Sequence, residues 1–211
     1  HREFWSLDFQ VGPGVLIPRP DSETLIEAAV DMLANRPPDS ILDLGTGSGA
    51  LLLAALSEWP EARGIGIDSS ETALDYARRN AEQLGLADRA QFRLGNWADG
   101  EARRFDLILC NPPYVDAADM RTLPAEFVAE PVMALAAGED GLAVMGPILE
   151  QLRDWLSDTG LFVGEVGGSA RALVAKYPSL PFIWLDLPHG GEGVFALEAT
   201  RLNSHTAPVL D

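Results

Sequence analysis

Apolar runs and helix-like segments alternate along this chain, and this alternation restricts its possible folds more than any other feature. Strand-like runs lie at 40–44, 63–68, 89–95, 105–111 and 160–166. Between and before them, apolar residues recur at helical spacing, which predicts helices over 21–36, 50–59, 69–85 and about 142–158. Such alternation predicts an α/β fold with a doubly wound, mostly parallel sheet covered by helices on both faces. Two later runs, PFIWLDL and GVFALEA, predict a C-terminal hairpin joined through PHGGEG, which makes a seven-stranded sheet.

Composition and charge limit the classes of partner. The 211 residues are 47% hydrophobic, which suits one α/β domain with a sizeable core. No apolar run approaches the roughly 18 residues of a membrane span. A net charge of −17 opposes binding to a phosphate backbone, because nonspecific nucleic-acid binding depends on Lys and Arg. We therefore expect no membrane association and no direct nucleic-acid binding, and basic proteins, neutral peptides or small molecules as partners.

A glycine-rich turn, DLGTGSGA, follows the first of the alternating strands. Glycines permit a tight bend there, and the next helix begins directly after it. The same residues satisfy the loose pattern of dinucleotide-binding loops, so the turn alone does not identify a ligand. The second strand ends at Asp68, where a carboxylate can accept hydrogen bonds from both hydroxyls of a ribose. The alternative is that Asp68 only caps the helix that starts at Ser69 or Ser70.

Two cofactors fit this arrangement, a nicotinamide dinucleotide and S-adenosylmethionine. The second carries no phosphates, so the glycine turn need only approach a methionine moiety and a ribose. The third strand ends in Gly95, Asn96 and Trp97, within reach of an adenine. Trp97 could cover the purine face while Asn96 bonds its edge. The alternative is that Trp97 is an ordinary core residue.

The fourth strand ends in CNPPYV, residues 110–115. Proline cannot continue a central strand, so the chain must leave the sheet at Pro112, and the ring of Pro113 stiffens the turn further. Asn111 is thereby a side-chain amide held at a rigid edge, close to Tyr114. An ordinary strand terminus is the simpler reading of Asn-Pro alone. The single cysteine, Cys110, is predicted to be a small buried hydrophobe rather than a nucleophile, and the scattered His residues offer no metal-ligand spacing.

Taken together and in this order, DLGTGSG, GIGID and NPPYV resemble the class I S-adenosylmethionine-dependent methyltransferases. IPRPDSETLIE (17–27) and EPVMALAAGEDGL (130–142) narrow the resemblance to the HemK-type protein-glutamine methyltransferases. The likeness runs from about Phe4 to Leu202. It implies methylation of the side-chain amide nitrogen of a glutamine in a translation protein, in the cytoplasm, by a monomeric enzyme that uses no metal.

The resemblance also implies a role for each matching residue. The loop around the cofactor's methionine part would be Gly45, Thr46, Gly47, Ser48 and Gly49. Asp68 would hold the ribose, with Asn96 and Trp97 at the adenine. Asn111 would touch both cofactor and substrate, and Asn111, Pro112 and Tyr114 would be catalytic. The substrate site would consist of Asn111, Pro112, Pro113 and Tyr114.

The resemblance further predicts how the chain is organised. Residues 1–203 would form the catalytic domain, with 1–20 leading into it and supplying a substrate-side loop, and 204–211 would be a tail. The family has a small helical domain before the catalytic one, and this chain, which opens HREFW, starts where that domain should end.

Two substrates remain open within the family. IPRPDSE resembles the branch that acts on the Gly-Gly-Gln loop of peptide-chain release factors, which we favour. LPAEFVAEP and YPSLPFIWLDLPHGGEGVFAL are closer to the branch that acts on a large-subunit ribosomal protein.

Three other classes of protein are weaker alternatives. A DNA or RNA amino-methyltransferase shares NPPY but needs a basic groove. A nicotinamide oxidoreductase leaves NPPY unexplained, and a non-enzymatic module does not account for the intact loop with Asp68 and Asn111.

Overall fold

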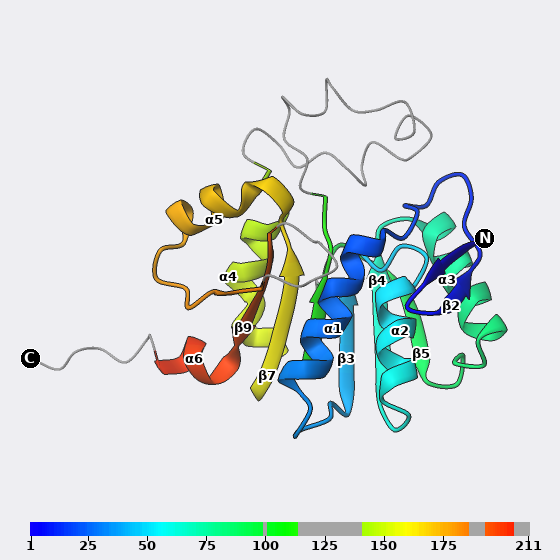
Figure 1. Ribbon diagram of the computed structural model, residues 1–211, viewed down its shortest axis with the longest axis horizontal. Helices are drawn as coiled ribbons and strands as arrows, with labels where there is room; N and C mark the ends of the chain where they lie inside the picture. Colours follow the sequence, from blue (N-terminus) through cyan, green and yellow to red (C-terminus); the bar gives the residue numbers. More distant parts are fainter. Residues whose placement is uncertain (99–100, 114–140, 186–192, 205–211) are drawn as a thin grey trace, which may run out of the picture.

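The computed structural model describes residues 1–98, 101–113, 141–185 and 193–204. A seven-stranded sheet with the order β5-β4-β3-β6-β7-β9-β8 forms its centre (Figure 1). Neighbouring strands from β5 to β7 are parallel, and β9 runs antiparallel to both β7 and β8. The predicted doubly wound sheet and its antiparallel final pair are thus confirmed. The strands are β3 (Ser40–Leu44), β4 (Arg63–Asp68), β5 (Ala90–Leu94), β6 (Phe105–Cys110), β7 (Leu156–Glu165), β8 (Ile183–Trp184) and β9 (Val194–Glu198).

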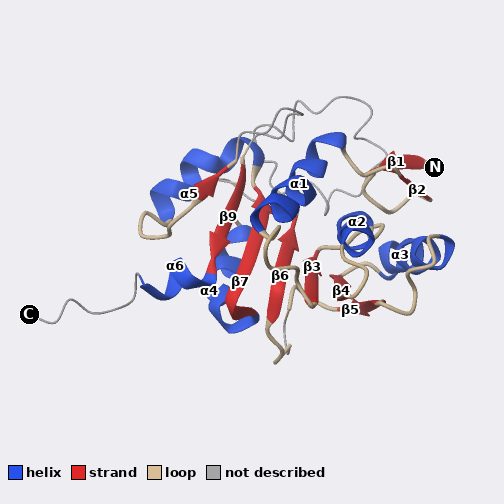
Figure 2. Ribbon diagram, turned by 60° about the horizontal axis from the view of Figure 1, so that its bottom comes forward, coloured by secondary structure: helices blue, strands red, loops and turns tan. Residues whose placement is uncertain are grey.

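Helices cover both faces of the sheet, as Figures 1 and 2 show. Successive strand residues point to opposite faces, so each central strand contributes to two cores. In β3, Ile41 packs in the cluster that includes α1 and α2, and Leu42 packs in the cluster that includes α4 and α5. The helices are α1 (Glu23–Met32), α2 (Ala50–Glu58), α3 (Glu71–Gln83), α4 (Met145–Trp155), α5 (Ala170–Lys176) and α6 (Ala199–Ser204).

The sequence signals for α3 act as predicted. Ser70 caps the helix, because its hydroxyl oxygen accepts a hydrogen bond from the Ala73 amide at 3.3 Å. Gly85 follows the helix with a φ of +70°, a left-handed conformation that glycine adopts without strain. Across the described residues, no helix combines the length and apolar character that crossing a bilayer requires.

Several predicted boundaries were wrong. The helix expected to reach residue 158 ends at Trp155, because Leu156 already pairs with Phe105 as the first residue of β7. The helix expected over 21–36 is shorter as well: a 3-10 turn, Pro20–Ser22, precedes α1, which ends at Met32. In the final pair, β8 has only two residues. At these ends the backbone N–H and C=O groups form their hydrogen bonds in a strand or a local turn. The apolar spacing in the sequence had predicted helix there.

A hairpin at the N-terminus was not predicted. Its strands, β1 (Arg2–Phe4) and β2 (Leu7–Phe9), are joined by Trp5 and Ser6, whose φ values are 52° and 58°. Two consecutive positive φ values suit a two-residue hairpin, since that turn matches the twist of the strands. The hairpin is not a loose end, because Phe4 and Phe9 are fully buried with ring centroids 6.2 Å apart.

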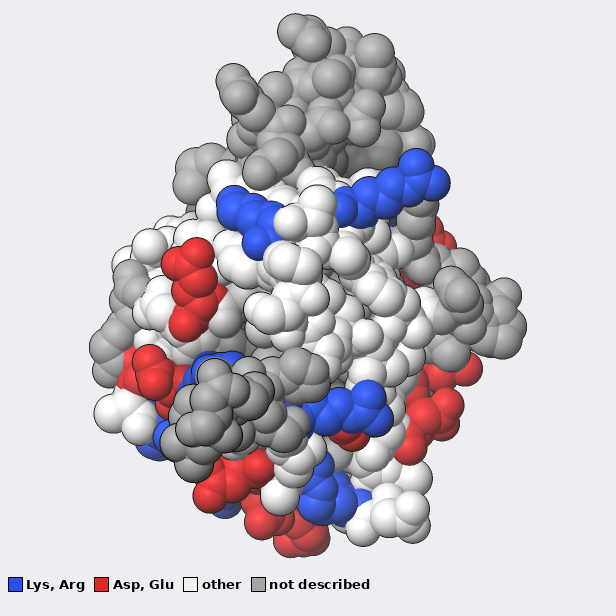
Figure 3. Space-filling model, turned by 90° about the vertical axis from the view of Figure 1, so that its left-hand side faces the viewer, with Lys and Arg blue, Asp and Glu red and all other residues white. Residues whose placement is uncertain are grey.

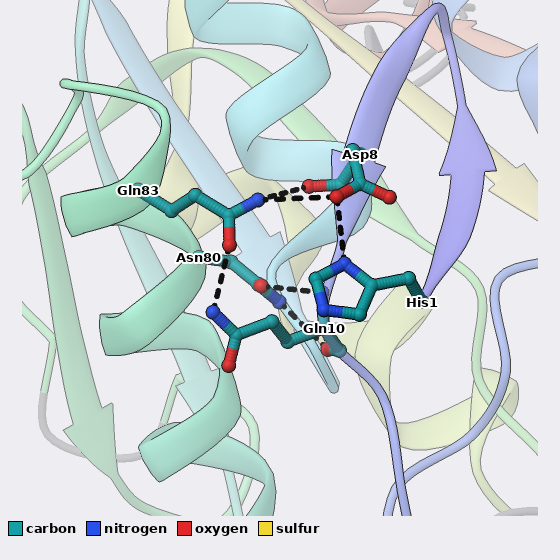
Figure 4. A network of polar contacts seen from close by, with 5 residues as sticks. All are labelled: His1, Asp8, Gln10, Asn80 and Gln83. Carbon is teal, nitrogen blue, oxygen red and sulfur yellow. Dashed lines mark hydrogen bonds and ion pairs between the residues drawn. The ribbon is translucent and has the colours of Figure 1, made fainter.

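Asn80 of α3 bonds to Gln10 in the segment after this hairpin (Figure 4), and it also bonds to the glycine-rich turn at Ser48. Its side-chain oxygen accepts from the Gln10 amide at 2.8 Å, and its nitrogen donates to the carbonyls of Gln10 and Ser48 at 3.1 and 2.9 Å. Gln83, one turn further along α3, donates to the Asp8 carbonyl at 2.8 Å, but this bond is exposed to solvent. Asn80 itself is completely buried. One buried amide therefore holds three separate parts of the chain together.

Replacing Asn80 by alanine should destabilise the protein strongly. Removal of the amide leaves the buried Ser48 carbonyl and the partly buried backbone groups of Gln10 without this partner, at about 1–3 kcal/mol for each buried group left unsatisfied. We expect Asn80→Ala to lower the free energy of unfolding by at least ~2 kcal/mol in urea denaturation. Gln83→Ala is the matched control, because water replaces its exposed bond, and it should cost less than ~1 kcal/mol. Equal losses in the two variants would contradict the role given to Asn80.

Candidate active site

A cavity of about 630 Å³ opens at the carboxyl ends of the parallel strands. This lies where the strand order reverses, with β4 and β5 to one side of β3 and β6 and β7 to the other. Open α/β sheets bind ligands at such a switch point, because the loops that follow neighbouring strands diverge there. The cavity gathers most of the predicted site residues, namely Gly45, Thr46, Gly47, Ser48, Asp68, Asn96, Trp97, Asn111 and Pro113.

The glycine-rich turn is held by the end of β4. The amides of Gly45 and Thr46 both donate to the Ile67 carbonyl, at 2.9 and 3.0 Å, and the Gly47 amide donates to Asp68 Oδ2 at 2.8 Å. A pyrophosphate would need amides like these as donors, and it would also be repelled by Asp68. The turn is therefore better suited to a ligand without phosphates, which favours S-adenosylmethionine over a nicotinamide dinucleotide.

The glycines of this turn meet different requirements. Gly45, Gly47 and Gly49 all have positive φ, at 74°, 55° and 83°. Gly47 faces open space: a Cβ there would have no neighbour closer than 4.0 Å. A Cβ on Gly49 would lie 3.2 Å from the Cβ of Ala77, so Gly49 allows α2 to pack against α3. Gly49 is not among the residues that line the cavity, and its predicted contact with the methionine part stays a prediction.

Asp68 combines the two roles that the sequence left open. Its Oδ1 accepts from the Ser70 amide at 2.8 Å, at the start of α3, while its Oδ2 accepts from Gly47. A carboxylate has about four lone-pair positions, so these two bonds leave acceptor capacity on Asp68, which lines the cavity. The surrounding backbone fixes its orientation. Asp68 can therefore bind a pair of hydroxyls without reorganising.

Asp43, within DLGTGSG, was not singled out from the sequence. It is fully buried beneath the turn, and its Oδ2 accepts from Thr46 Oγ1 at 2.6 Å and from the Leu52 amide at 3.3 Å. Its Oδ1 is the one buried side-chain polar atom of the described residues without a hydrogen-bond partner. Burial raises the pKa of Asp43 to about 7 despite those two bonds, and the charge of Asp68 adds to the rise. The signal for Asp43 in the sequence was an acidic residue two positions before the first glycine of the turn.

Asn96 and Trp97 reach the cavity from the turn after β5. Trp97 has a φ of +52°, uncommon for a bulky residue, and a Cβ on Gly45 would lie 3.5 Å from its ring. The indole is half-buried rather than enclosed in the core, so one side of it lines the cavity. Among the predicted alternatives, this geometry favours a flat surface for a planar ligand over an ordinary core tryptophan.

The chain leaves β6 at Asn111. Because β3 lies between β4 and β6 and is parallel to both, Asn111 lies on the opposite side of β3 from Asp68, at the same edge of the sheet. Asn111 and Pro113 line the cavity, and Pro112 is buried. Tyr114 lies outside the described residues. Asn111 Nδ2 donates to the hydroxyl oxygen of Ser22 at 2.7 Å, a contact that the sequence did not predict.

Residues before α1 form a wall of the cavity that sequence reasoning reached only through resemblance. Gly14, Val15, Leu16, Pro18 and Ser22 line it, together with Phe4 of the hairpin. They carry no motif of their own apart from IPRPDSE. Their position depends on the anchoring of Gln10 by Asn80, which lies far away in the sequence.

The described residues of this site support neither a thiol nucleophile nor a metal centre. Burial raises the pKa of the Cys110 thiol well above its usual value, so the predicted buried hydrophobe is confirmed. Among the described residues, no group of three or more His, Cys, Asp or Glu side chains could hold a metal ion.

Comparison with known proteins defines the class. Residues 36–167 match the family model described as "Methyltransferase domain", and the chain belongs to this family of S-adenosylmethionine-dependent methyltransferases. Two curated relatives are glutamine methyltransferases, which confirms the resemblance found in the sequence.

The first of these relatives is the release factor glutamine methyltransferase of Rhodospirillum rubrum. It is 45% identical over 173 residues, which is 81% of this chain and 53% of the relative. The second is the ribosomal protein uL3 glutamine methyltransferase of Francisella tularensis. It is 36% identical over 202 residues, 94% of this chain and 64% of the relative. The chain thus spans between about half and two thirds of the length of these relatives.

Solved structures show the same fold. The catalytic domain of hMettl16, solved in complex with MAT2A 3'UTR hairpin 6, matches with a TM-score of 0.71 at 16% identity, over 92% of this chain and 76% of that one. An RNA methyltransferase from Salinibacter ruber, in complex with S-adenosyl-L-homocysteine, matches with a TM-score of 0.55 at 21% identity, over 88% of this chain and 94% of that one. At these identities the likeness extends to the fold alone.

The raised pKa of Asp43 should appear in the pH dependence of stability. The folded protein retains a proton that the unfolded chain releases near pH 4, so stability falls as the pH rises towards about 7. Asp43→Asn removes this titration with little change in shape. From about pH 5 to about pH 8, wild type should lose ~2–3 kcal/mol relative to the variant in urea denaturation. Asp31→Asn, at an exposed position of α1, is the control. If the free energy of unfolding of Asp43→Asn changes with pH in parallel with that of wild type, the prediction is wrong.

Proposed function

We propose that this chain transfers a methyl group from S-adenosylmethionine to the side-chain amide nitrogen of a glutamine in a translation protein, which leaves S-adenosylhomocysteine and releases one amide hydrogen as a proton. One observation supports this most directly. The turn after β3, the acid that ends β4 and the Asn111–Pro113 turn after β6 line a single cavity. Both curated relatives are, by name, glutamine methyltransferases.

The residues around the cavity fit this cofactor. The half of the cavity at β3, β4 and β5 has an open face at Gly47, a fixed carboxylate at Asp68 and the indole of Trp97. We assign the methionine part to the turn Gly45–Gly49, the ribose to Asp68, and the adenine to Asn96 and Trp97. When bound, S-adenosylmethionine supplies a methyl group on a positively charged sulfur, open to attack by a nucleophile.

The turn after β6 has the chemistry to hold the acceptor. A glutamine amide is a weak nucleophile, because its nitrogen lone pair is delocalised into the carbonyl. Asn111 Oδ1 and the Pro112 carbonyl can accept its two hydrogens, which fixes the nitrogen and favours loss of conjugation. Pro112 has no N–H to compete, and Pro113 restricts the turn. Tyr114 completes the proposed substrate site. Positioning of this kind contributes on the order of 7–11 kcal/mol at best.

Release factors are the substrate that we favour. The higher identity, 45%, is to the release factor enzyme, although the match to the ribosomal protein enzyme covers more of this chain. A glutamine must also leave its own protein to enter the cavity, and the glycines of a Gly-Gly-Gln loop make that easier. Translation proteins are cytoplasmic, so we place the reaction there. The monomeric state and the domain limits, 1–203 with a tail at 204–211, stay predictions.

Charge argues against a nucleic-acid substrate. The net charge of −17 disfavours a phosphate backbone. On the face shown in Figure 3, the Lys and Arg side chains of the described residues are interspersed with acidic and uncharged ones and form no continuous basic stripe. A nucleic-acid groove would need them side by side.

Asp68→Ala should weaken cofactor binding. Loss of hydrogen bonds to a charged group costs about 1.5–3 kcal/mol, which raises the Kd for S-adenosylmethionine ~10- to 100-fold in titration calorimetry. Ser70→Ala removes the cap of α3 instead, so it should lower thermal stability and change Kd by less than ~3-fold. If both variants lose the same affinity, Asp68 acts only through the helix.

A mixed incubation tests the function itself. Purified release factor and the ribosomal protein, in equal amounts, are incubated with the enzyme and S-adenosylmethionine and examined by mass spectrometry. We expect one methyl group on the Gly-Gly-Gln glutamine, formed faster than any methyl on the ribosomal protein. Asn111→Ala should slow the reaction ~100-fold. Methyl only on the ribosomal protein would reverse the order of substrates, and methyl on neither would contradict the proposal.

A further inference from the structure

Three side chains from distant parts of the sequence form a hydrogen-bonded chain beside the cavity. Asn111 Nδ2 donates to Ser22 Oγ at 2.7 Å, and Ser22 Oγ donates to Glu165 Oε2 at 3.0 Å. Ser22 belongs to the turn before α1, Asn111 follows β6, and Glu165 ends β7. Ser22 and Glu165 are only 5% and 4% exposed.

The direction of these bonds follows from the groups themselves. The single hydroxyl hydrogen of Ser22 is donated to Glu165 Oε2. The Ser22 oxygen is then left as an acceptor, and a donor must face it. Asn111 meets this requirement only with its NH₂ group towards Ser22. Its Oδ1 must therefore point away from Ser22.

The two ends of an asparagine amide have nearly the same shape but opposite hydrogen-bonding character. A rotation of about 180° exchanges them, so an unrestrained Asn111 could present either a donor or an acceptor. Methylation of an amide nitrogen requires an acceptor for its hydrogen. The Ser22–Glu165 pair disfavours the wrong orientation, because a flipped Asn111 would bring its oxygen against the oxygen of the buried Ser22.

We propose that Ser22 and Glu165 are positioning residues that hold the Asn111 amide with its oxygen available to the substrate. This inference rests on the proposed function, because it gives Asn111 the acceptor role. The competing explanation is mechanical: Ser22 and Glu165 attach the segment before α1 to the sheet and have no influence on Asn111. The two explanations differ in whether the direction of the hydrogen bonds matters.

Single substitutions give the first test. Ser22→Ala removes the hydroxyl that links Asn111 to Glu165. Glu165→Gln leaves the Ser22 hydroxyl free to donate to residue 165 or to accept from it. Each variant should lower kcat ~10-fold and leave the Kd for S-adenosylmethionine unchanged. Ser22→Thr keeps the hydroxyl and should stay within ~3-fold of wild type. Ser157→Ala is the matched control: Ser157 also donates to a carboxylate, Asp106 Oδ1 at 2.9 Å, but at the opposite end of the sheet, and it should keep full activity. Wild-type kcat in Ser22→Ala would overturn the proposal.

Reversal of the hydrogen bonds is the sharper test. Asn111→Asp alone sets two carboxylates against one hydroxyl hydrogen. Adding Glu165→Gln supplies an NH₂ group that donates to Ser22, so Ser22 can donate to the new aspartate, whose second oxygen then faces the substrate. The double variant should be ~10-fold more active than Asn111→Asp alone. Additive losses would show that direction is irrelevant and would overturn the proposal.

A measurement without substrate separates this inference from the proposed function. In protein labelled with ¹⁵N-asparagine, the Asn111 side-chain amide is the signal lost in Asn111→Asp. Its hydrogens should exchange with solvent ~10-fold faster in Ser22→Ala and in Glu165→Gln than in wild type or Ser157→Ala. Equal exchange in all four proteins would overturn the proposal even if the enzyme is active. If wild type methylates neither substrate, the proposed function fails, while the exchange rates still decide the orientation of Asn111.

Discussion

The parallel register of β3 with its two neighbours is the constraint on which the site depends. Leu44 pairs with Ile67 of β4 on one side and with Cys110 of β6 on the other. The next residue in each case is Gly45, Asp68 or Asn111, so three residues of the proposed site meet at one edge of the sheet. Slippage by one residue would turn each side chain to the other face. Buried apolar residues on both faces of β3 oppose such slippage, since both cores would be disrupted.

Carboxylates concentrate near this edge although the protein already carries a large negative charge. Asp43 is buried without a partner for one oxygen, Asp68 lines the cavity, and Glu165 is buried behind Ser22. Burying such groups is unfavourable unless they are paired or hydrogen-bonded. Here each acts on a neighbour: Asp43 on Thr46, Asp68 on Gly47, and Glu165 on Ser22. The negative charge of Asp68, which lines the cavity, also favours a positively charged ligand, which agrees with a sulfonium cofactor and disagrees with a pyrophosphate.

The N-terminal segment is part of the site rather than an appendage. Its hairpin is fixed by Phe4 and Phe9 in the core, and the following residues are fixed by Asn80. Between these anchors and α1, residues of this segment line the cavity, and its last residue, Ser22, contacts Asn111. The segment that encloses the cavity therefore also contacts Asn111, the proposed catalytic residue. This explains why a resemblance in IPRPDSE, which has no catalytic group, accompanied the motifs on the strands.

The strands of the central sheet, their alternation with helices, the glycine-rich turn and the polar residues at the ends of β3, β4 and β6 could all be predicted from the amino-acid sequence. These features are local, because periodicity, glycine and proline act over a few residues. Contacts between distant segments were decided only by the tertiary structure. Asn80 interrupts the apolar face of α3, and no local signal says that its partners are Gln10 and Ser48. The proposed orientation of Asn111 likewise depends on Ser22 and Glu165. Ser22 lies 89 residues before Asn111 in the sequence, and Glu165 lies 143 residues after Ser22. Hydrogen-bond direction between such groups follows from three-dimensional proximity, which a linear pattern does not contain.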